Sequence, residues 1–224
     1  MGFVVEQIWR YPIKSIGGER LQLSYADESG LRGDRVWAVQ DDAGKLGSGK
    51  DSRRFTRILG LLDLSASYVD DMPVISAPDG QYPVPGAADA YLQAMTGRSL
   101  HVRRDTGTMH FDEVPFSLVG TATLDWLANR VTVPVDARRL RPNIVVRTEE
   151  PFAEEAWVGR TVRIGEVEAI FDRVFMRCVM VNMAQPGLPL GNVLNKIGQR
   201  ADPCMAIGGT VCKPGTIRLG DIVC

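Results

Sequence analysis

Residues 176–187 read MRCVMVNMAQPG, and they place Cys178 directly after Arg177 at the end of a valine-rich segment of β type. An adjacent positive charge lowers the pKa of a thiol, and the thiolate is the form that attacks sulfur or binds a soft metal. Cys178 is therefore the first candidate for chemistry. The residues alone also allow an inert core thiol, because free cysteine is often buried and apolar residues flank it on both sides.

Short segments of β-type composition extend outward from this stretch in both directions. They are predicted at residues 3–9, 35–39, 58–67, 143–147, 161–170, 174–181 and 216–223. Turns rich in Gly, Pro and Asp separate them, for example at residues 28–33, 41–49 and 77–86. This spacing predicts mixed or barrel-like β structure, and a regular parallel alternation of strands and helices is not expected.

Three helices are predicted among these strands, at residues 87–95, 121–129 and 190–197. The second begins with a threonine, so its first amides and the positive end of its dipole can face an anion. The chain becomes polar and basic near residues 97–109 before an apolar pattern resumes, which indicates a boundary between two domains, 1–100 and 101–224. The predicted fold class is mostly β with a few helices, that is, α+β.

Composition and charge exclude several classes of protein. The chain has 224 residues, 45% of them hydrophobic, which is enough for one large or two small cores. Its 26 basic and 27 acidic residues nearly balance, so no general attraction to nucleic acid or membrane is expected. Neither a signal peptide nor an apolar run of membrane-spanning length is apparent. We therefore expect a cytoplasmic protein.

The cysteines and histidines restrict any metal chemistry. The four cysteines lie in the last quarter of the chain without a C-x-x-C pair, which disfavours zinc ribbons and iron–sulfur clusters, and a disulfide is not expected in a reducing cytoplasm. With only His101 and His110 present, a three-histidine site is impossible. Metal binding should therefore depend on sulfur. A pyridoxal phosphate site is not expected.

One sequence pattern suggests a nucleotide-binding phosphate loop, but the residue that follows it argues against that function. Gly44, Gly49 and Lys50 match G-x-x-x-x-G-K after an apolar strand. Asp51, however, stands where a Ser or Thr hydroxyl should bind magnesium, and its carboxylate would repel nucleotide phosphates. We interpret this loop as the tip of a hairpin.

Other basic residues stand at strand ends or turns. Lys14 precedes Ser15, Arg35 follows a Gly-Asp pair, and Arg141 precedes Pro142 and Asn143. The planar fork of arginine suits bidentate contact with phosphate, whereas lysine acts as a compact point charge. Taken singly, each is also compatible with a solvated side chain or a surface ion pair.

Six motifs, in this order along the chain, carry a family resemblance. They are YPIKSIGGE (11–19), GLRGDRVWAV (30–39), DEVPFSLVGTATLDWL (112–127), RLRPNIVV (139–146), MRCVMVNMAQPG (176–187) and KPGTIRLGDIV (213–223). Together they resemble the MOSC family, in the branch that carries an N-terminal β-barrel segment. This resemblance implies a MOSC-type β-barrel at residues 101–224, packed with a smaller β-barrel-like domain at residues 1–100.

The resemblance also implies a cofactor and its ligands. Proteins of this family bind the molybdenum cofactor, a pyranopterin whose dithiolene holds the metal and whose side chain ends in a phosphate. By motif position, Cys178 should be the catalytic residue and the sulfur ligand of the metal. The implied cofactor contacts are Lys14, Ser15, Arg35, Thr121, Thr123, Arg141, Asn143 and Arg177. Gly120 and Met176 depart from the family pattern, which bears mainly on the range of substrates.

The function implied by the resemblance is reduction of N-hydroxylated small molecules, such as amidoximes and hydroxylamines. Because the chain lacks an iron–sulfur or flavin motif, its electrons should come from a separate reductase, such as a flavin, iron–sulfur or b-type cytochrome protein. Two alternatives keep Cys178: a sulfur carrier or sulfurtransferase that uses a persulfide, and a protein that carries the molybdenum cofactor without catalysis.

Overall fold

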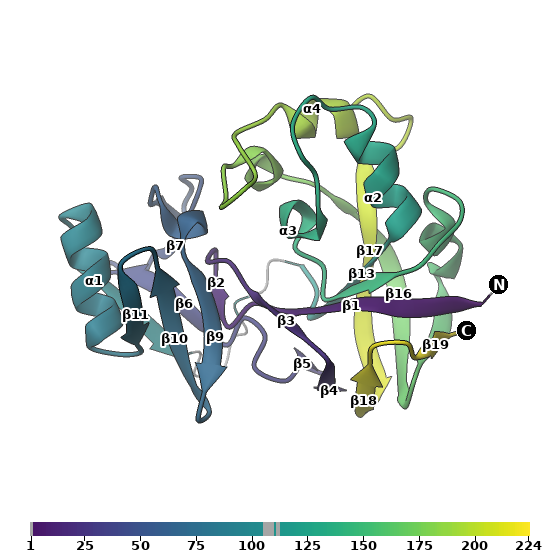
Figure 1. Ribbon diagram of the computed structural model, residues 1–224, viewed down its shortest axis with the longest axis horizontal. Coiled ribbons are helices and arrows are strands. Elements are labelled where there is room, and N and C mark those ends of the chain that lie inside the picture. Colours follow the sequence, from purple (N-terminus) through teal and green to yellow (C-terminus); the bar gives the residue numbers. More distant parts are fainter. Residues whose placement is uncertain (1, 105–109, 111–112) are drawn as a thin grey trace.

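The computed structural model describes residues 2–104, 110 and 113–224. Most of its ordered elements are strands, and short helices cover their edges, so the predicted α+β class is confirmed. Figure 1 shows two parts side by side: a larger one that contains both chain termini, and a smaller one built from residues of the first half.

The larger part is built on one long sheet. Its strands are β1 (Phe3–Arg10), β3 (Glu19–Leu21), β13 (Phe116–Gly120), β14 (Ile144–Val146), β15 (Arg160–Ile164), β16 (Val167–Met176), β17 (Cys204–Lys213) and β19 (Ile222–Val223). They lie in the order β14-β13-β17-β16-β15-β19-β1-β3. Because β1 pairs with β14 as well as with β19, the strands from β14 to β1 close into a barrel.

Alternation along β15 and β16 shows why this barrel has an apolar interior. Val162 and Ile164 of β15 are buried, as are Val167, Ala169 and Phe171 of β16, whereas the residues between them are more exposed. Successive strand side chains point to opposite faces, so this pattern fills the inside and solvates the outside. The same core includes residues of β1, β13, β14 and β17.

The smaller part has its own sheets and core. One sheet joins β12 (Leu100–Arg104), β6 (Trp37–Asp41), β7 (Leu46–Ser48) and β8 (Phe55–Arg57), with β2 (Ile13–Lys14) beside β6. A second sheet joins β9 (Ser65–Val69), β10 (Met72–Ala77) and β11 (Gly80–Pro83). Both sheets contribute residues to one apolar core. The helix α1 (Ala87–Thr96) and the 3-10 turn η1 (Leu61–Asp63) add residues to the same core.

The first strands cross between the two parts. Strands β1 and β3 belong to the large sheet, and β4 (Leu23–Asp27) pairs with β5 (Gly30–Leu31) and with β18 (Gly215–Arg218) from the end of the chain. Residues before the predicted division at residue 100 therefore supply strands to the large sheet. The reason is that the N-terminal strand supplies the hydrogen bonds that close the C-terminal barrel.

The helices agree with the sequence analysis better than the strand ends do. Helices α1 and α2 (Thr121–Ala128) lie where they were predicted, whereas α4 (Val193–Ile197) is shorter than expected. Local periodicity did not indicate α3 (Ala137–Leu140), η2 (Ala153–Trp157) or η3 (Val179–Asn182). Strands β13 and β14 are parallel neighbours joined through α2 and α3, so one parallel crossover exists where no regular alternation was expected.

Four predicted strands were wrong in their extent. Residues 216–223 are divided between β18 and β19, which belong to different sheets. Residues 161–170 form the β15–β16 hairpin, which turns at Gly165 with a φ of 59°. Residues 58–67 hold η1 and only the start of β9. The segment 174–181 leaves the sheet after Met176, where its pairing with β17 ends opposite Cys204. Among the described residues, no helix has both the length and the apolar character needed to cross a lipid bilayer.

Candidate functional site

A cavity of about 340 Å³ opens between the two parts of the molecule. Its walls come from the ends of β2, β7, β16 and β17 and from the loops beside them. Six cationic side chains line it: Lys14, Arg35, Lys50, Arg54, Arg141 and Arg177. Glu113 is the one carboxylate among the described lining residues. A chain of nearly zero net charge therefore concentrates positive potential at one point, which favours an anionic ligand.

Cys178 lies on the wall of this cavity and is half-buried. It follows the end of β16 and occupies the N-cap position of η3, where its carbonyl accepts the amide of Val181 at 3.2 Å. The side chain before it, Arg177, is anchored by a hydrogen bond from its Nη2 to the carbonyl of Leu140. Burial lowers the pKa of Arg177, and the neighbouring Cys178 opposes this decrease. The expected cysteine and arginine thus share one wall.

Two arginines of the cavity wall pack against Tyr11, which is fully buried and does not itself line the cavity. The guanidinium carbons of Arg141 and Arg35 lie 4.1 and 4.9 Å from the centre of its ring. Burial raises the pKa of Tyr11, although both arginines oppose the increase. The hydroxyl of Tyr11 and the Nε of Arg177 are buried and have no hydrogen-bond partner among the described residues. Such unsatisfied donors are costly and fit a site that is completed by a polar ligand.

Asp34 binds both Tyr11 and Arg35. Its carboxylate accepts the amide of Tyr11 at 2.7 Å, the side-chain amide of Asn143 at 3.0 Å and a guanidinium hydrogen of Arg35. Asn143 is fully buried and in turn accepts the amide and the hydroxyl of Ser117, each at 3.1 Å. Asn143 was expected to contact the cofactor, but it does not line the cavity. It holds Asp34, which binds Arg35, and Ser117, and both Arg35 and Ser117 line the cavity.

Sequence reasoning missed a cationic group around Phe55. The Nζ atoms of Lys14 and Lys50 lie 5.4 and 4.9 Å from the centre of its ring, and the guanidinium carbon of Arg54 lies 5.4 Å from it. Gly44 lies in the hairpin turn between β6 and β7, as interpreted from the sequence. Gly49 and Lys50 follow β7 and lead into the parallel strand β8, which stands in place of the helix that a phosphate loop needs. The basic residues after the turn nevertheless face the cavity.

Left-handed backbone is concentrated at this cavity. Ser15, Arg35, Arg141 and Ala206 all line it, and their φ values are 64°, 52°, 53° and 73°. Only three other described non-glycine residues have positive φ: Asp70, Asp71 and Phe152. A side chain in this region costs about 1–2 kcal/mol, so the fold stores strain where it presents these residues.

The two threonines expected at the site lie elsewhere. Thr123 is fully buried, donates to Glu154 Oε2 at 2.9 Å and accepts the amide of Phe152 at 2.7 Å. Thr121 Oγ1 accepts the amide of Thr148 at 3.1 Å. Both fasten the start of α2 to the loop after β14, outside the described lining of the cavity.

Gly120 shows why this helix start departs from the family pattern. A Cβ placed on Gly120 would lie 2.6 Å from both Glu154 Oε2 and Thr148 Oγ1, closer than such atoms can approach. Any side chain at this position would therefore force Glu154 or Thr148 to move. Burial raises the pKa of Glu154, which fills this space.

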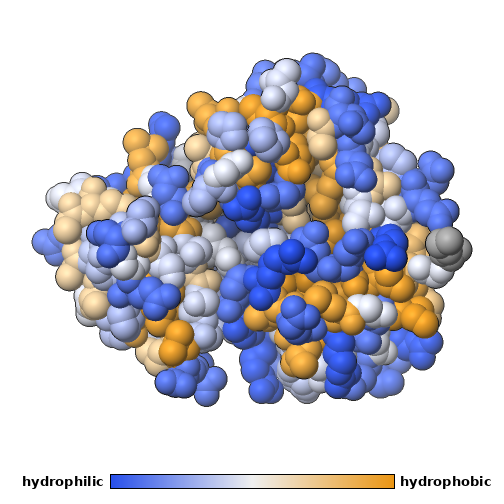
Figure 2. Space-filling view, in the orientation of Figure 1, coloured by the Kyte–Doolittle hydropathy of each residue, from blue (hydrophilic) through white to orange (hydrophobic). Residues whose placement is uncertain are grey.

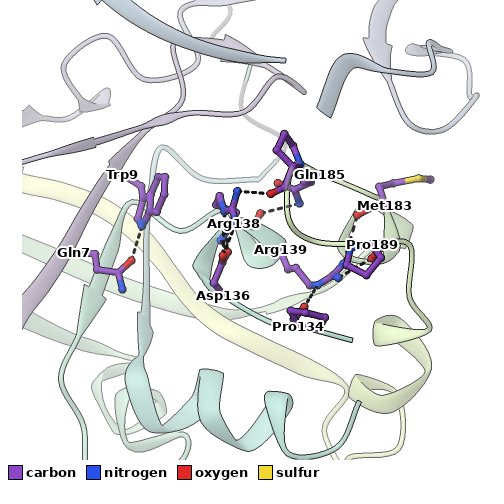
Figure 3. A network of polar contacts seen from close by, with 10 residues as sticks. Gln7, Trp9, Pro134, Asp136, Arg138, Arg139, Met183, Gln185 and Pro189 are labelled. Atoms are coloured by element: carbon purple, nitrogen blue, oxygen red, sulfur yellow. Dashed lines mark hydrogen bonds and ion pairs between the residues drawn. The ribbon is translucent and has the colours of Figure 1, made fainter. Parts of the chain in front are cut away.

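The wall that follows Cys178 is held by a buried arginine (Figure 3). Arg139 is 1% exposed and donates to the carbonyls of Pro134 at 2.9 Å, Val181 at 3.2 Å and Pro189 at 2.8 Å, with a longer contact of 3.4 Å to Met183. Burial lowers its pKa. The neighbouring Arg138 pairs with Asp136 nearer to the surface. Arg139 therefore holds the backbone at Val181 and Pro189, and Arg138 Nη1 adds a bond to the carbonyl of Pro186 at 2.9 Å.

The remaining cysteines and histidines lie away from the cavity lining. Burial raises the pKa of the Cys204 thiol to about 11. Cys212 and Cys224 are exposed. His101 contacts the carboxylates of Asp89 and Asp42, each at 3.3 Å. Cys178 is thus the one thiol among the described residues that line the cavity.

Comparison with known families agrees with this architecture. The model of the MOSC N-terminal beta barrel domain matches residues 2–133, and that of the MOSC domain matches residues 105–224. The chain belongs to the MOSC family. The two matches overlap at residues 105–133.

Two similar proteins carry the same name. Mitochondrial amidoxime-reducing component 1 of Mus musculus is 26% identical over 279 residues, which cover 98% of this MOSC chain and 81% of the mouse protein. Its namesake from Homo sapiens is 24% identical over 223 residues, which cover 80% of this chain and 66% of the human protein. The crystal structure of the YUAD protein from Bacillus subtilis has the same fold, with a TM-score of 0.55 and 14% identity over the whole of this chain and 94% of that one.

Proposed function

We propose that this protein is an oxidoreductase that uses the molybdenum cofactor to reduce N-hydroxylated small molecules such as amidoximes and hydroxylamines. The observation that carries the proposal is the position of Cys178, a half-buried thiol on the wall of a cavity lined by six cations. A soft thiolate ligand beside an anion-binding surface is what a sulfur-bound metal with a phosphorylated carrier requires. Membership of the family and the names of the two mammalian relatives support the same choice.

The residues on the cavity wall fit such a cofactor. Cys178 would supply one sulfur ligand to the metal, and Lys14, Ser15, Arg35, Arg141 and Arg177 would hold the phosphate and the pterin edges. The buried hydroxyl of Tyr11 and the Nε of Arg177 offer donors that lack a partner among the described residues. When bound, the molybdenum supplies two-electron redox chemistry at the end of the cavity marked by Cys178.

The surrounding residues would keep the cofactor rigid. Asp34 accepts from the guanidinium of Arg35 and is itself held by Asn143, and Arg35 Nη2 also donates to the carbonyl of Arg141 at 2.9 Å. We propose that Thr121 and Thr123 act indirectly, by holding the start of α2 to the loop that carries Thr148 and Phe152. A preorganised set of this kind avoids reorganisation when the ligand binds.

The overall reaction needs two electrons and two protons for each N–O bond that is cleaved, with water as the second product. We propose that a separate flavin, iron–sulfur or b-type cytochrome protein delivers the electrons. We also propose that the protein works in the cytoplasm, without nucleic acid or membrane as partners. Purified protein should then be active only when an artificial donor replaces the reductase.

The test uses protein expressed in a host that makes the cofactor and is supplied with molybdate. We expect reduction of benzamide oxime with reduced methyl viologen as donor, and loss of that activity in Cys178→Ser. In Arg35→Ala and Arg141→Ala we expect molybdenum content to fall severalfold, because each removes a charge from the anion site. Arg147→Ala is the matched control, since Arg147 is largely exposed and pairs only with Glu6 at 3.5 Å among the contacts described.

Three outcomes would overturn the proposal. Full molybdenum content in both Arg35→Ala and Arg141→Ala would contradict the anion site. A persulfide on Cys178 in protein without molybdenum would indicate the sulfur carrier. Bound molybdenum without turnover of any N-hydroxylated substrate would indicate a protein that only carries the cofactor.

A further inference from the structure

A second cavity, of about 300 Å³, adjoins the first. The two share Ser15 and Met180 in their walls, so they lie next to each other, and together they are called the shared depression below. The smaller part of the molecule contributes the apolar residues Ile58, Leu59, Leu61 and Leu62, and the larger part contributes Met180, Met183 and Leu190. Cations crowd the first cavity, whereas this one has Arg57 and Asp63 as its charged described lining residues.

The apolar lining combines a buried floor with an exposed rim. Ile58 and Leu61 are buried beneath the cavity, whereas Leu59 and Leu190 are each 68% exposed on its two sides. In Figure 2, hydrophobic residues gather over the α4 end of the larger part, and a further hydrophobic group lies above β7 on the smaller part. When an apolar group covers leucines that are this exposed, the free energy of the system falls, because apolar surface is removed from water.

The walls of this second cavity are held in place before any ligand binds. The buried Arg139 fixes the backbone at Val181, Met183 and Pro189, which carry the wall of the larger part. On the opposite side, Ser48 Oγ lies 3.8 Å from Met180 Sδ, and a Cβ added to Gly49 would lie only 2.8 Å from the same sulfur. Close packing of Met180 against residues 48–49 keeps the two walls together. A preformed apolar pocket binds without a large ordering cost.

The apolar side chains that line the second cavity indicate what kind of chemical group it binds. A pterin and a phosphate need hydrogen-bond donors and cations, and those line the first cavity. The thioethers and aliphatic side chains of the second instead suit an uncharged apolar group, because methionine adapts its shape and contacts aromatic rings favourably. A dry cavity of about 150 Å³ is enough for benzene, so 300 Å³ has room for one substituted ring or two fused rings.

We infer that the second cavity is a specificity site for the apolar part of the substrate, an aromatic or branched aliphatic group carried by the N-hydroxylated function. This inference rests on the proposed function, because it places the N–O group at the Cys178 end of the shared depression. The site selects substrates that carry such a group over small ones that lack it, because its lining consists mainly of aliphatic side chains and thioethers.

The kinetic test compares two substrates that differ only in their apolar part, benzamide oxime and acetamide oxime, with reduced methyl viologen as donor. Leu59→Ser and Leu190→Ser each remove an exposed apolar rim residue without opening the core. We expect each to raise KM for benzamide oxime by about fivefold, with kcat and both constants for acetamide oxime nearly unchanged. Ile222→Ser is the matched control, since Ile222 is 62% exposed on β19 and does not line this cavity.

A binding test separates this inference from the reductase proposal. Benzamide carries the ring without the N–O group, and its contact with the protein is followed by saturation-transfer NMR whether or not the protein is active. We expect a signal that weakens severalfold in Leu190→Ser and persists in Ile222→Ser. An unchanged signal in Leu190→Ser, or equal KM changes for the two substrates, would overturn the specificity site. Benzamide binding without turnover of either oxime would overturn the reductase proposal and leave an aromatic-binding site.

Discussion

The buried guanidinium of Arg139 allows a quantitative prediction. Substitution by Met keeps most of the apolar stem but removes every hydrogen bond to the carbonyls of Pro134, Val181, Met183 and Pro189. These carbonyls organise the segment directly after Cys178, so the change affects both the stability of the fold and one wall of the site.

The size of the effect follows from the bond lengths. Three of the four bonds measure 3.2 Å or less and count fully, whereas the contact of 3.4 Å to Met183 counts little. Each strong bond contributes about 1 kcal/mol net, and a carbonyl left without its partner costs at least as much. Removal of the arginine also ends its own desolvation cost, which opposes the loss. We therefore expect Arg139→Met to lower the free energy of unfolding by about 3 kcal/mol.

Urea unfolding of Arg139→Met and Arg138→Met measures this difference with a matched neighbour. Arg138 is partly exposed, pairs with an exposed Asp136 and donates one exposed hydrogen bond to the carbonyl of Pro186 at 2.9 Å, so its loss should cost about 1 kcal/mol. Amide hydrogen exchange in residues 179–190 should also accelerate more in Arg139→Met than in Arg138→Met, because Arg139 holds more of the carbonyls of this segment. If the two variants unfold within 1 kcal/mol of each other, the reasoning that Arg139 carries this wall is refuted.

Three further changes test individual features of the site. Tyr11→Phe should leave the free energy of unfolding of cofactor-free protein within about 1 kcal/mol of the parent, because the hydroxyl has no partner among the described residues, yet it should reduce molybdenum content about twofold or more; equal molybdenum content would show that the hydroxyl does not contact the cofactor. Ala206→Gly should raise the free energy of unfolding by about 0.5–1 kcal/mol, because relief of the left-handed strain at a φ of 73° exceeds the entropy cost of glycine; urea unfolding checks this, and a clear loss of stability would contradict the strain. Glu154→Gln should become increasingly stabilising, relative to the parent, as the pH rises above 4.5. Burial raises the pKa of Glu154 in the folded protein, so the unfolded chain releases this proton first and the parent loses folding stability from that pH upward. A difference in stability between the two proteins that does not change from pH 4.5 to 8 would refute this assignment.

Local sequence features predicted the elements that depend on local forces. Helices α1 and α2 follow from their apolar spacing and from the turn residues at their ends, and β1 follows from its β-branched composition. The hairpin turn at Gly44 was predicted from local sequence, whereas the connection from Gly49 to β8 joins parallel strands and was not. Strand ends at residues 164–167 and after Met176 depend on which neighbour pairs with the chain, and that information is not local.

The candidate site was predictable where a motif carried the chemistry itself. Lys14, Ser15, Arg35, Arg141, Arg177 and Cys178 meet on one cavity although they are distant in sequence. Tyr11 lies three residues before Lys14 and could have been suspected as an aromatic platform for arginine. Lys50 and Arg54 could not, because only the packing of the smaller part against the barrel turns their loop toward Cys178. Thr121 and Thr123 carry hydroxyls that satisfy the backbone of a neighbouring loop, which a motif does not distinguish from ligand contact.

Molybdenum content per chain, measured by mass spectrometry on protein from a cofactor-producing host, tests the central claim most directly. The comparison needs the parent, Cys178→Ser and the exposed Cys212→Ser, each confirmed as folded by circular dichroism. We predict nearly one molybdenum per chain in the parent and in Cys212→Ser, and a loss of most of it in Cys178→Ser. Equal molybdenum in all three folded proteins would contradict the assignment of Cys178 as the metal ligand.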